Sequence, residues 1–476
     1  MGSESESSPL RVVIFPWLAF GHMLPYLELS ERLAARGHHV SYVSTPRNLA
    51  RLPPLRPASA PRIHFVSLPL PHVDGLPQGA ESTNDVPDDK RQLHWKAFDG
   101  LAAPFAEFLA AACAHEATRP HWVIADSFPY WAAASAEEHK VPCALLLPTA
   151  AAIAAVPPPP RQGRQPSAEP PAAASLPRHE REALAPVYTD QGVSSLSTMQ
   201  RWSLTREKCT LGAIRSCVEW EPESFPQVAG LLGMPVVPLG LLPPPPEGGR
   251  RAAGSNGADH PTVRWLDAQP PGSVLYVALG SEVPLPVESV HELALGLELA
   301  GTRFLWALRK PSGAAVQDKD GADMLPPGIL DRTRDVGLVS TGWVPQMTIL
   351  AHAAVGGFLT HCGQNSLTEG LMFGHPLVML PLFWDQGPNA RQMEAKNVGL
   401  QVPRDDKDGS IDRHGVASTV RAVMHEGEAR SGFLAGAAKM QEIVNDNELH
   451  ERYVDELVQH LRTAGATNGA APPTSS

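Results

Sequence analysis

A short segment in the C-terminal half gathers residues suited to binding an anion. An apolar strand pattern, Phe358–Thr360, runs into His361 and Gly363, and Asn365 or Ser366 is placed to cap a following helix. The free N–H groups and positive dipole end of that helix, with His361 and Ser366 as further donors, suit a phosphate or diphosphate. An ordinary capped helix with a histidine in its turn explains this segment about equally well.

Two flanking segments favour the anion site. Upstream, Trp343-Val344-Pro-Gln346 offers an aromatic ring for stacking on a base and an amide for the edge of that base. Downstream, Asp385 and Gln386 offer an acid and an amide for sugar hydroxyls. Glu369, one turn into the predicted helix, can accept hydrogen bonds from a ribose. Together these segments predict a site for a nucleotide sugar.

The chain alternates strand and helix patterns, which place such residues at strand ends. Val12–Leu18 is a continuous apolar run, a turn follows at Ala19–His22, a helical pattern is closed by Gly37, and His39–Val43 resumes as a strand. This β-α-β unit puts the turn at the carboxyl end of the first strand, the edge where open α/β sheets bind ligands.

Composition divides the chain into two parts. Residues 157–177 predict a loose surface loop, and the Pro/Gly-rich residues 243–261 predict a linker. We therefore expect an N-terminal domain over residues 1–242 and a C-terminal domain over residues 262–476, both α/β with largely parallel sheets. Further predicted elements are strands at Ile63–Leu68, Trp122–Ala125, Cys143–Leu147, Val274–Leu279, Arg303–Leu308 and Val355–Thr360, and a helix at Val287–Ala300.

Charge and composition exclude several classes of protein. The net charge of −11 argues against a nucleic-acid partner, which would need basic stripes. The five cysteines form no C-x-x-C pair, so we expect reduced thiols and no structural zinc. The acidic N-terminus lacks a signal-peptide pattern, and no apolar run is long enough to span a bilayer. These features predict a cytoplasmic protein without stable membrane insertion.

The stretch from Trp343 to Gln386 resembles the 44-residue signature of plant secondary-product UDP-glycosyltransferases. It has the same length, opens on W-x-P-Q, contains H-C-G-x-N-S-x-x-E-G and closes on D-Q. The resemblance extends over most of the chain. It implies a GT-B fold, in which two Rossmann-like domains face each other across a cleft, with the acceptor mainly in the first and the UDP-sugar mainly in the second. It also implies inversion at the anomeric carbon without a metal, and a last helix that packs back on the N-terminal domain.

The resemblance assigns a role to each residue of the donor site. Trp343 would stack on uracil, with Val344 beside it, and Gln346 would contact the edge of the base or the ribose. Glu369 would hold the ribose hydroxyls. Asp385 and Gln386 would bind hydroxyls of the transferred sugar. The residues expected at the diphosphate are His361, Gly363, Asn365, Ser366 and Ser281.

The resemblance also implies the catalytic pair. The family's base is a histidine in the first β-α turn, and His22 matches it. A hydroxyl is a poor nucleophile at neutral pH, so a base within hydrogen-bond reach is required. Asp126, directly after the strand Trp122–Ala125, matches the partner that orients the imidazole. A lone turn histidine more often has only a structural hydrogen bond, but with Asp126 and the donor segment present we favour a catalytic pair.

One position departs from the family pattern. Relatives nearly always have tryptophan after H-C-G, and here Gln364 stands in that place, beside the expected sugar. Its amide would replace an aromatic wall with a group able to bond a hydroxyl. We expect UDP-glucose as donor because of Asp385 and Gln386, with UDP-rhamnose as the alternative. A weak or non-catalytic nucleotide-sugar binder is a further possibility. A dehydrogenase is disfavoured, because no G-x-G-x-x-G follows the first strand.

The acceptor side resembles the 91 branch of the family, which adds a sugar to a sugar already attached to a terpenoid or flavonoid. Trp17–His22, Glu81–Asp85 and Thr302–Arg309 carry that resemblance, and Glu282 follows the phosphate serine as in the sugar-on-sugar branch. A carboxylate suits acceptor-sugar hydroxyls, although a solvated loop acid explains Glu282 nearly as well. We expect a monomer that forms a 1,2-linked disaccharide on a small-molecule glycoside.

Other acceptor-site candidates are weaker. His94, in the segment Gln92–Trp95, is one, and Phe20 is another. Phe20, Trp131 and the Ala-rich segment around Ala150 could line an apolar aglycone pocket or belong to the core.

Overall fold

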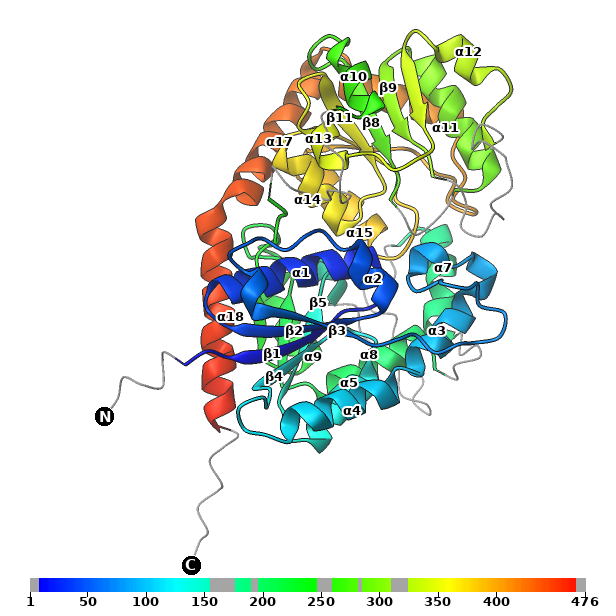
Figure 1. Cartoon of the computed structure of the whole chain (residues 1–476). Helices are drawn as coiled ribbons and strands as arrows, with labels where there is room; N and C mark the ends of the chain where they lie inside the picture. The colour runs from blue at the N-terminus through cyan, green and yellow to red at the C-terminus, as the bar shows by residue number, and fades with distance from the viewer. Residues whose placement is uncertain are drawn as a thin grey trace, which may run out of the picture.

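The protein folds around two parallel sheets, one from each half of the chain (Figure 1). This computed structural model describes residues 8–154, 176–189, 196–245, 259–280, 285–309 and 324–467. The predicted loop at 157–177 and linker at 243–261 therefore lie mostly outside the described residues, and Ser281 and Glu282 lie wholly outside them. The prediction of an α/β protein with two parallel sheets is confirmed.

The first sheet has seven strands in the order β3-β2-β1-β4-β5-β6-β7. Their bounds are β1 Arg11–Phe15, β2 His39–Ser44, β3 Ile63–Ser67, β4 Trp122–Ala125, β5 Cys143–Leu147, β6 Leu211–Ile214 and β7 Val236–Pro238. The second sheet has six strands in the order β10-β9-β8-β11-β12-β13. Their bounds are β8 Val274–Ala278, β9 Arg303–Ala307, β10 Gly337–Ser340, β11 Val355–Thr360, β12 Leu377–Met379 and β13 Gly399–Gln401. All pairings between neighbouring strands in both sheets are parallel.

Helices cover both faces of each sheet. In the first half they are α1 Phe20–Ala35, α2 Pro46–Arg51, α3 Arg91–Asp99, α4 Ala102–Cys113, α5 Tyr130–Glu138, α6 Ala151–Ala154, α7 Arg178–Thr189, α8 Thr198–Lys208 and α9 Phe225–Leu232. In the second half they are α10 Pro261–Asp267, α11 Val287–Ala300, α12 Ile329–Thr333, α13 Gln346–Leu350, α14 Gln364–Met372, α15 Gln386–Ala395, α16 Arg413–Met424, α17 Glu428–Asn445 and α18 Asn447–Thr467. Short 3₁₀ turns occupy Ala60–Arg62, Thr83–Asp85 and Asp88–Lys90.

The alternation of strand side chains splits each half into two apolar cores. On the first sheet, α1 and α18 pack on the face that carries Val12 and Ile14, whereas α3, α4, α5 and α8 pack on the face that carries Val13 and Phe15. On the second sheet, α11 and α16 cover one face, and α10, α13, α14 and α17 cover the other. Burial on both faces explains the continuous apolar sequences of central strands such as β4, β5 and β8.

The C-terminal helix joins the two halves. Figure 1 shows α17 beside the second sheet and α18 continuing along the first domain. The indole Nε1 of Trp122 in β4 donates to the carbonyl of Leu461 at 2.7 Å, and Arg32 and Arg36 of α1 pair with Glu451 at 2.9 and 2.7 Å. These contacts cover the charged side of α1, and Arg32 is only 7% exposed because α18 lies against it.

Two expectations about where helices begin were wrong. His22 was expected in a turn before the first helix, but α1 already begins at Phe20, so His22 lies in its first turn. Asn365 or Ser366 was expected to cap the helix after β11, but the N-cap of α14 is Gly363. Gly363 has the extended backbone that is usual for an N-cap, and no side chain caps the first turn of α14. In the described part of the chain, no helix is both long and apolar enough to cross a membrane.

Candidate active site

The first candidate pair lies where the strand order of the first sheet reverses. β1 and β4 are neighbours, and the next strands run outward from them in opposite directions, so their carboxyl ends meet at the switch point where open parallel sheets form a ligand-binding crevice. His22 follows β1 and Asp126 follows β4. The imidazole Nδ1 of His22 lies 2.8 Å from the Oδ2 atom of Asp126.

Asp126 is held rigidly and is fully buried. Its Oδ2 also accepts from the backbone N–H of Trp17 at 2.9 Å, and its Oδ1 accepts from the N–H of Ser127 at 2.6 Å. An ionised carboxylate only accepts hydrogen bonds, so Nδ1 of His22 carries the hydrogen and Nε2 is the basic ring atom. The His22 side chain remains 26% exposed, which leaves its ring accessible from the crevice.

The second sheet has a matching reversal between β8 and β11. Gly280 follows β8, and His361 follows β11. A Cβ atom at Gly280 would lie 2.5 Å from Nε2 of His361, and one at Gly363 would lie 2.6 Å from the same atom. Two glycines therefore leave the space that the His361 ring occupies, and Gly280 also has a left-handed backbone, with φ of +75°.

Strained backbone marks both loops of this second crevice. Cys362 and Trp384 are non-glycine residues with φ of 65° and 56°. Such conformations persist where the surroundings hold them, often at functional sites. Asn389 of α15 links the two loops, because its Nδ2 donates to the carbonyl of Cys362 at 3.0 Å and to Oδ2 of Asp385 at 3.3 Å.

The start of α14 provides the candidate anion site. The first N–H groups of a helix have no partner within it, and the helix dipole favours negative charge there. Ser366 is in this first turn and 7% exposed. The side chain of Asn365 is engaged elsewhere: its Nδ2 donates to the carbonyl of Gly21 in the first domain at 3.2 Å, and its Oδ1 accepts from Arg215. Its predicted contact with the diphosphate stays a prediction.

The candidate nucleoside residues lie together on the second domain. Trp343 is 46% exposed, which is unusual for a large aromatic residue and leaves its ring open for stacking. Val344 packs below it against the core. Gln346 begins α13, and its Nε2 donates to Glu369 of α14. Its Oε1 accepts from the hydroxyl of Tyr276 at 3.2 Å.

Gln364 has an unusual environment for an amide. It is 5% exposed, and within the described residues neither its Nε2 nor its Oε1 has a hydrogen-bond partner. Burying an amide without partners is costly, and a bound ligand with hydroxyl groups would remove that cost.

Asp385 links the two domains through a hydrogen bond. The hydroxyl of Thr149, two residues after β5, donates to its Oδ2 at 3.1 Å. Burial raises the pKa of Asp385, and the hydrogen bonds from Thr149 and Asn389 and the nearby charge of His22 offset part of that rise. Gln386 folds back instead, and its Oε1 accepts from the N–H groups of Leu382 and Phe383 at 2.9 and 3.0 Å.

The acceptor candidates are more scattered. Phe20 lies in the first turn of α1, with the guanidinium of Arg51 4.6 Å from its ring centroid. His94 is only 2% exposed, behind Trp17, and its Nε2 lies 3.2 Å from the carbonyl of Glu81. Trp131 and Ala150 are buried, and Trp131 packs against Phe15 with ring centroids 5.3 Å apart, which places it in the core.

Sequence reasoning missed three residues that the structure brings to this crevice, namely Thr149, Arg215 and Asn389. Thr149 and Arg215 follow β5 and β6, so a search for polar residues just after strands at the crevice would have found both. Asn389 stands four residues after Asp385 in α15 and gives no such signal.

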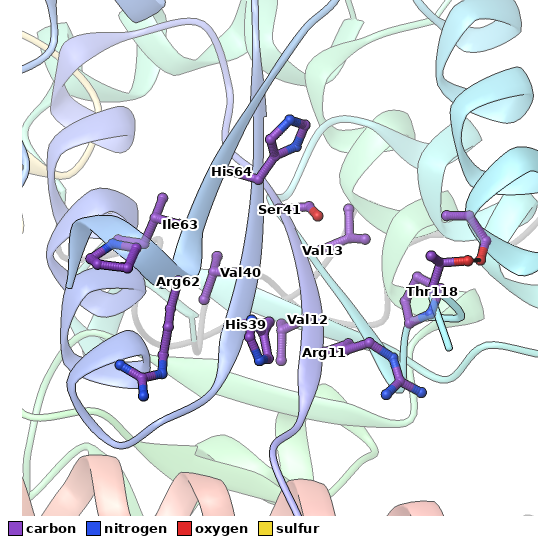
Figure 2. A pocket seen from close by; sticks show the side chains of 13 residues that line it. Arg11, Val12, Val13, His39, Val40, Ser41, Arg62, Ile63, His64 and Thr118 are labelled. Carbon is purple, nitrogen blue, oxygen red and sulfur yellow. Dashed lines mark hydrogen bonds between the residues drawn. The ribbon is translucent and has the colours of Figure 1, made fainter. Parts of the chain in front are cut away.

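A separate cavity of about 270 Å³ lies at the other end of the first sheet. Figure 2 shows Arg11, His39 and His64 around it. These residues belong to the amino-terminal parts of β1, β2 and β3, away from the edge that carries His22. In the described part of the chain, no cluster of His, Cys, Asp or Glu is arranged to hold a metal ion.

Comparisons with known proteins agree with this geometry. Residues 251–430 match the family profile described as UDP-glucoronosyl and UDP-glucosyl transferase. UDP-glycosyltransferase 91D2 of Stevia rebaudiana is 41% identical, over 96% of this chain and 95% of that protein. Soyasaponin III rhamnosyltransferase of Glycine max is 34% identical, over 97% of both chains. The crystal structure of Arabidopsis thaliana UGT89C1 complexed with UDP-L-rhamnose matches with a TM-score of 0.75 and 25% identity, covering 96% of this chain and 100% of that one.

The similarity runs across both halves of the chain, and the shared architecture confirms the GT-B fold. The chain therefore belongs to the plant UDP-glycosyltransferases, in their 91 group, and is an enzyme that transfers a sugar from a UDP-sugar.

Proposed function

We propose that this enzyme inverts the anomeric carbon of a UDP-hexose while transferring the hexose to a hydroxyl of a small-molecule glycoside, with His22 as base and Asp126 as its partner. The observation that carries this proposal is the 2.8 Å contact between His22 and Asp126 at a crevice that also holds Asp385. Base and sugar-binding acid come from opposite domains, as a reaction between an acceptor and a donor requires.

The reaction needs one proton transfer and one displacement. Nε2 of His22 takes the proton of the acceptor hydroxyl as its oxygen forms a bond to C1 of the sugar. The bond from C1 to the diphosphate oxygen breaks, and UDP leaves. The buried carboxylate of Asp126 stabilises the imidazolium that forms, and the amino end of α14 stabilises charge on the departing diphosphate.

We propose different residues for the different parts of the UDP-sugar. Trp343 and Gln346 are proposed for uracil, and Glu369 for the ribose. His361, Gly363 and Ser366 are proposed for the diphosphate. The exposed ring of Trp343 and the Gln346–Glu369 hydrogen bond support this division. The division into domains 1–242 and 262–476 with a linker at 243–261 remains our proposal, supported by the position of β7 before the linker and β8 after it.

UDP-glucose is our proposed donor. Gln364 and Asp385 give the sugar pocket an unpartnered amide and a carboxylate, groups that suit a sugar with a full set of hydroxyls. UDP-rhamnose is the second candidate, because a relative from Glycine max is named a rhamnosyltransferase and a matching structure holds UDP-L-rhamnose. The acceptor is proposed to be a glycoside of a terpenoid or flavonoid, on the similarity to the 91 group and the name of the soyasaponin relative. We further propose a monomeric, cytoplasmic enzyme.

A mutation tests the catalytic assignment. His22→Ala is expected to abolish transfer and leave the affinity for UDP unchanged, because the ring lies in the other domain from the nucleotide residues. His64→Ala is the matched control, since His64 is an exposed histidine of the same sheet beside the separate cavity. Full transfer activity in His22→Ala would overturn the assignment.

A donor-by-acceptor assay read by mass spectrometry tests the substrates. UDP-glucose and UDP-rhamnose are each offered with aglycones and with their monoglucosides. Glucose added to monoglucosides is the expected product. UDP binding without turnover on any acceptor would support the non-catalytic alternative instead.

A further inference from the structure

Arg215 is a charged residue buried between the two domains. It follows β6 directly and is 2% exposed. Its Nε donates to the carbonyl of Leu241 at 2.7 Å, and its Nη1 donates to Oδ1 of Asn365 in α14. The guanidinium therefore reaches from the first sheet to the amino end of the helix that forms the candidate anion site.

Among the described residues, this guanidinium has no carboxylate partner within ion-pair distance. Both of its hydrogen-bond acceptors are neutral, and none of the ion pairs between described residues includes Arg215. Burial lowers the pKa of Arg215 to about 10, and the charges of Glu369 and Glu28 offset only part of that effect. The carboxylate of Glu28 already pairs with Arg32 at 2.8 Å. That of Glu369 accepts from the neutral amide of Gln346, so its charge is felt by Arg215, but the two form no ion pair. A buried charge without a partner is costly, so an anion at this place would be stabilised.

Asn365 links Arg215 to the turn that carries His22. Its Oδ1 faces Arg215, so its Nδ2 must face the other way, and it donates to the carbonyl of Gly21, the residue before His22. Leu241 on the other side of the guanidinium has its N–H 3.4 Å from Nδ1 of His450, at the start of α18. Arg215 thus joins the anion-binding helix, the turn that carries His22, and the segment where the chain crosses between domains.

We propose that Arg215 is a positioning residue of the transfer reaction, which holds Asn365 between α14 and the His22 turn, and whose charge is balanced by the diphosphate of the bound nucleotide. This inference rests on the proposed function, in which the amino end of α14 binds that diphosphate. Loss of the Arg215 charge weakens binding of the diphosphate. Loss of the hydrogen bonds that Arg215 makes misplaces His22 relative to the donor.

Two substitutions distinguish the effect of the Arg215 charge from the effect of its hydrogen-bonding geometry. Arg215→Met keeps the length and removes the charge, and it leaves the carbonyl of Leu241 and Oδ1 of Asn365 without their donor. We expect its Kd for UDP to rise on the order of tenfold while its Kd for uridine, which has no phosphate, stays the same. Arg215→Lys keeps the charge and loses the forked geometry. We expect its Kd for UDP to stay close to that of the wild type and its kcat to fall, with KM for the donor little changed.

Arg201→Met is the matched control. Arg201 is 1% exposed, like Arg215, but Asp99 balances its charge through Nη2 and Oδ2 at 2.6 Å. This control is expected to lower Tm and leave the ratio of UDP to uridine affinity unchanged. Calorimetric titration of each folded variant with UDP and with uridine measures that ratio.

The outcomes distinguish the two proposals. If the wild-type enzyme prefers UDP to uridine and Arg215→Met keeps that preference, the role of Arg215 is wrong. If the wild-type enzyme binds both equally, the anion site at α14 is wrong whatever Arg215 does. If Arg215→Met does not fold, Arg215→Lys decides: unchanged kcat in that variant contradicts the positioning role.

Discussion

Thr149 and Asp385 form a hydrogen bond across the domain interface, 3.1 Å from hydroxyl to carboxylate. The residues are far apart in sequence, and each stands at the crevice of its own domain. The contact lowers the pKa of a carboxyl that burial raises. It therefore favours the ionised form of Asp385, the form that we propose accepts hydrogen bonds from sugar hydroxyls.

Removing this bond should move the acid limb of the pH–rate profile. Thr149→Val keeps the shape and loses the donor, so the pKa of Asp385 is expected to rise further. Activity then falls at a higher pH on acidification than in the wild type, and KM for the donor increases. Thr149→Ser keeps the hydroxyl and should retain the wild-type profile. Superimposable kcat/KM profiles for the wild type and Thr149→Val would contradict the role of the bond.

Asp126→Asn is expected to prevent His22 from acting as a base, while a side chain of similar size stays in place. Oδ2 of Asp126 accepts from both His22 and Trp17, and Oδ1 accepts from Ser127. An amide cannot accept at both atoms. If its NH₂ faces His22, the imidazole must carry its hydrogen on Nε2, where it cannot act as a base.

We expect kcat to fall by about 10²–10⁴, the usual contribution of general-base catalysis. Titration with UDP should give an unchanged Kd, because Asp126 is in the other domain from the nucleotide residues. A kcat close to that of the wild type would show that the imidazole works without its carboxylate.

The glycines around His361 should be irreplaceable. Gly363→Ala places a Cβ atom 2.6 Å from Nε2 of His361, so the ring must move out of its position beside the anion site. We expect Kd for UDP to rise on the order of tenfold, as strain of about 1–3 kcal/mol would produce. Gly230→Ala in α9, where an added Cβ meets nothing within 4 Å, is the control. Equal UDP affinity in the two variants would mean that the ring position does not matter.

The sequence predicted the long buried elements of this structure better than the short ones. Helix α11 and strand β11 have the predicted bounds, because long apolar patterns fix them. Strands β12 and β13 have only three residues each, too few for a pattern, and they were missed. The same limit applies to the site. Strand ends and a family signature located His22 and Asp385, and the same search of strand ends would have found Thr149. Asn389 becomes recognisable only once the fold places it against Asp385.

Acidification should destabilise the fold through its buried histidines. His38 is 3% exposed, and burial together with the charges of Arg462 and Arg36 lowers its pKa from 6.5 to about 4. Between these two values the unfolded chain binds a proton at this site that the folded chain does not. Stability that is present above pH 6.5 is therefore lost as the pH falls toward 4.

His38→Asn isolates this contribution. Its Oδ1 can replace Nδ1 of His38 as acceptor for the N–H of Leu10, which lies 3.2 Å away, and it does not titrate. Urea midpoints measured at several pH values should fall less steeply on acidification in the variant than in the wild type. Parallel curves would assign the pH dependence to other groups.

The last prediction concerns α18, which covers the first sheet although it is the last helix of the described residues. Leu457 is fully buried in the core between α18, α1 and the first sheet. Leu457→Ala removes apolar volume there and leaves a cavity, so unfolding free energy should fall by about 2–5 kcal/mol. Gln459→Ala, two residues further along the same helix and exposed, should change little. Thermal unfolding followed by circular dichroism measures both. If the two variants melt at the same temperature, α18 does not stabilise the first domain, and its packing against β4 and α1 does not contribute to the free energy of unfolding.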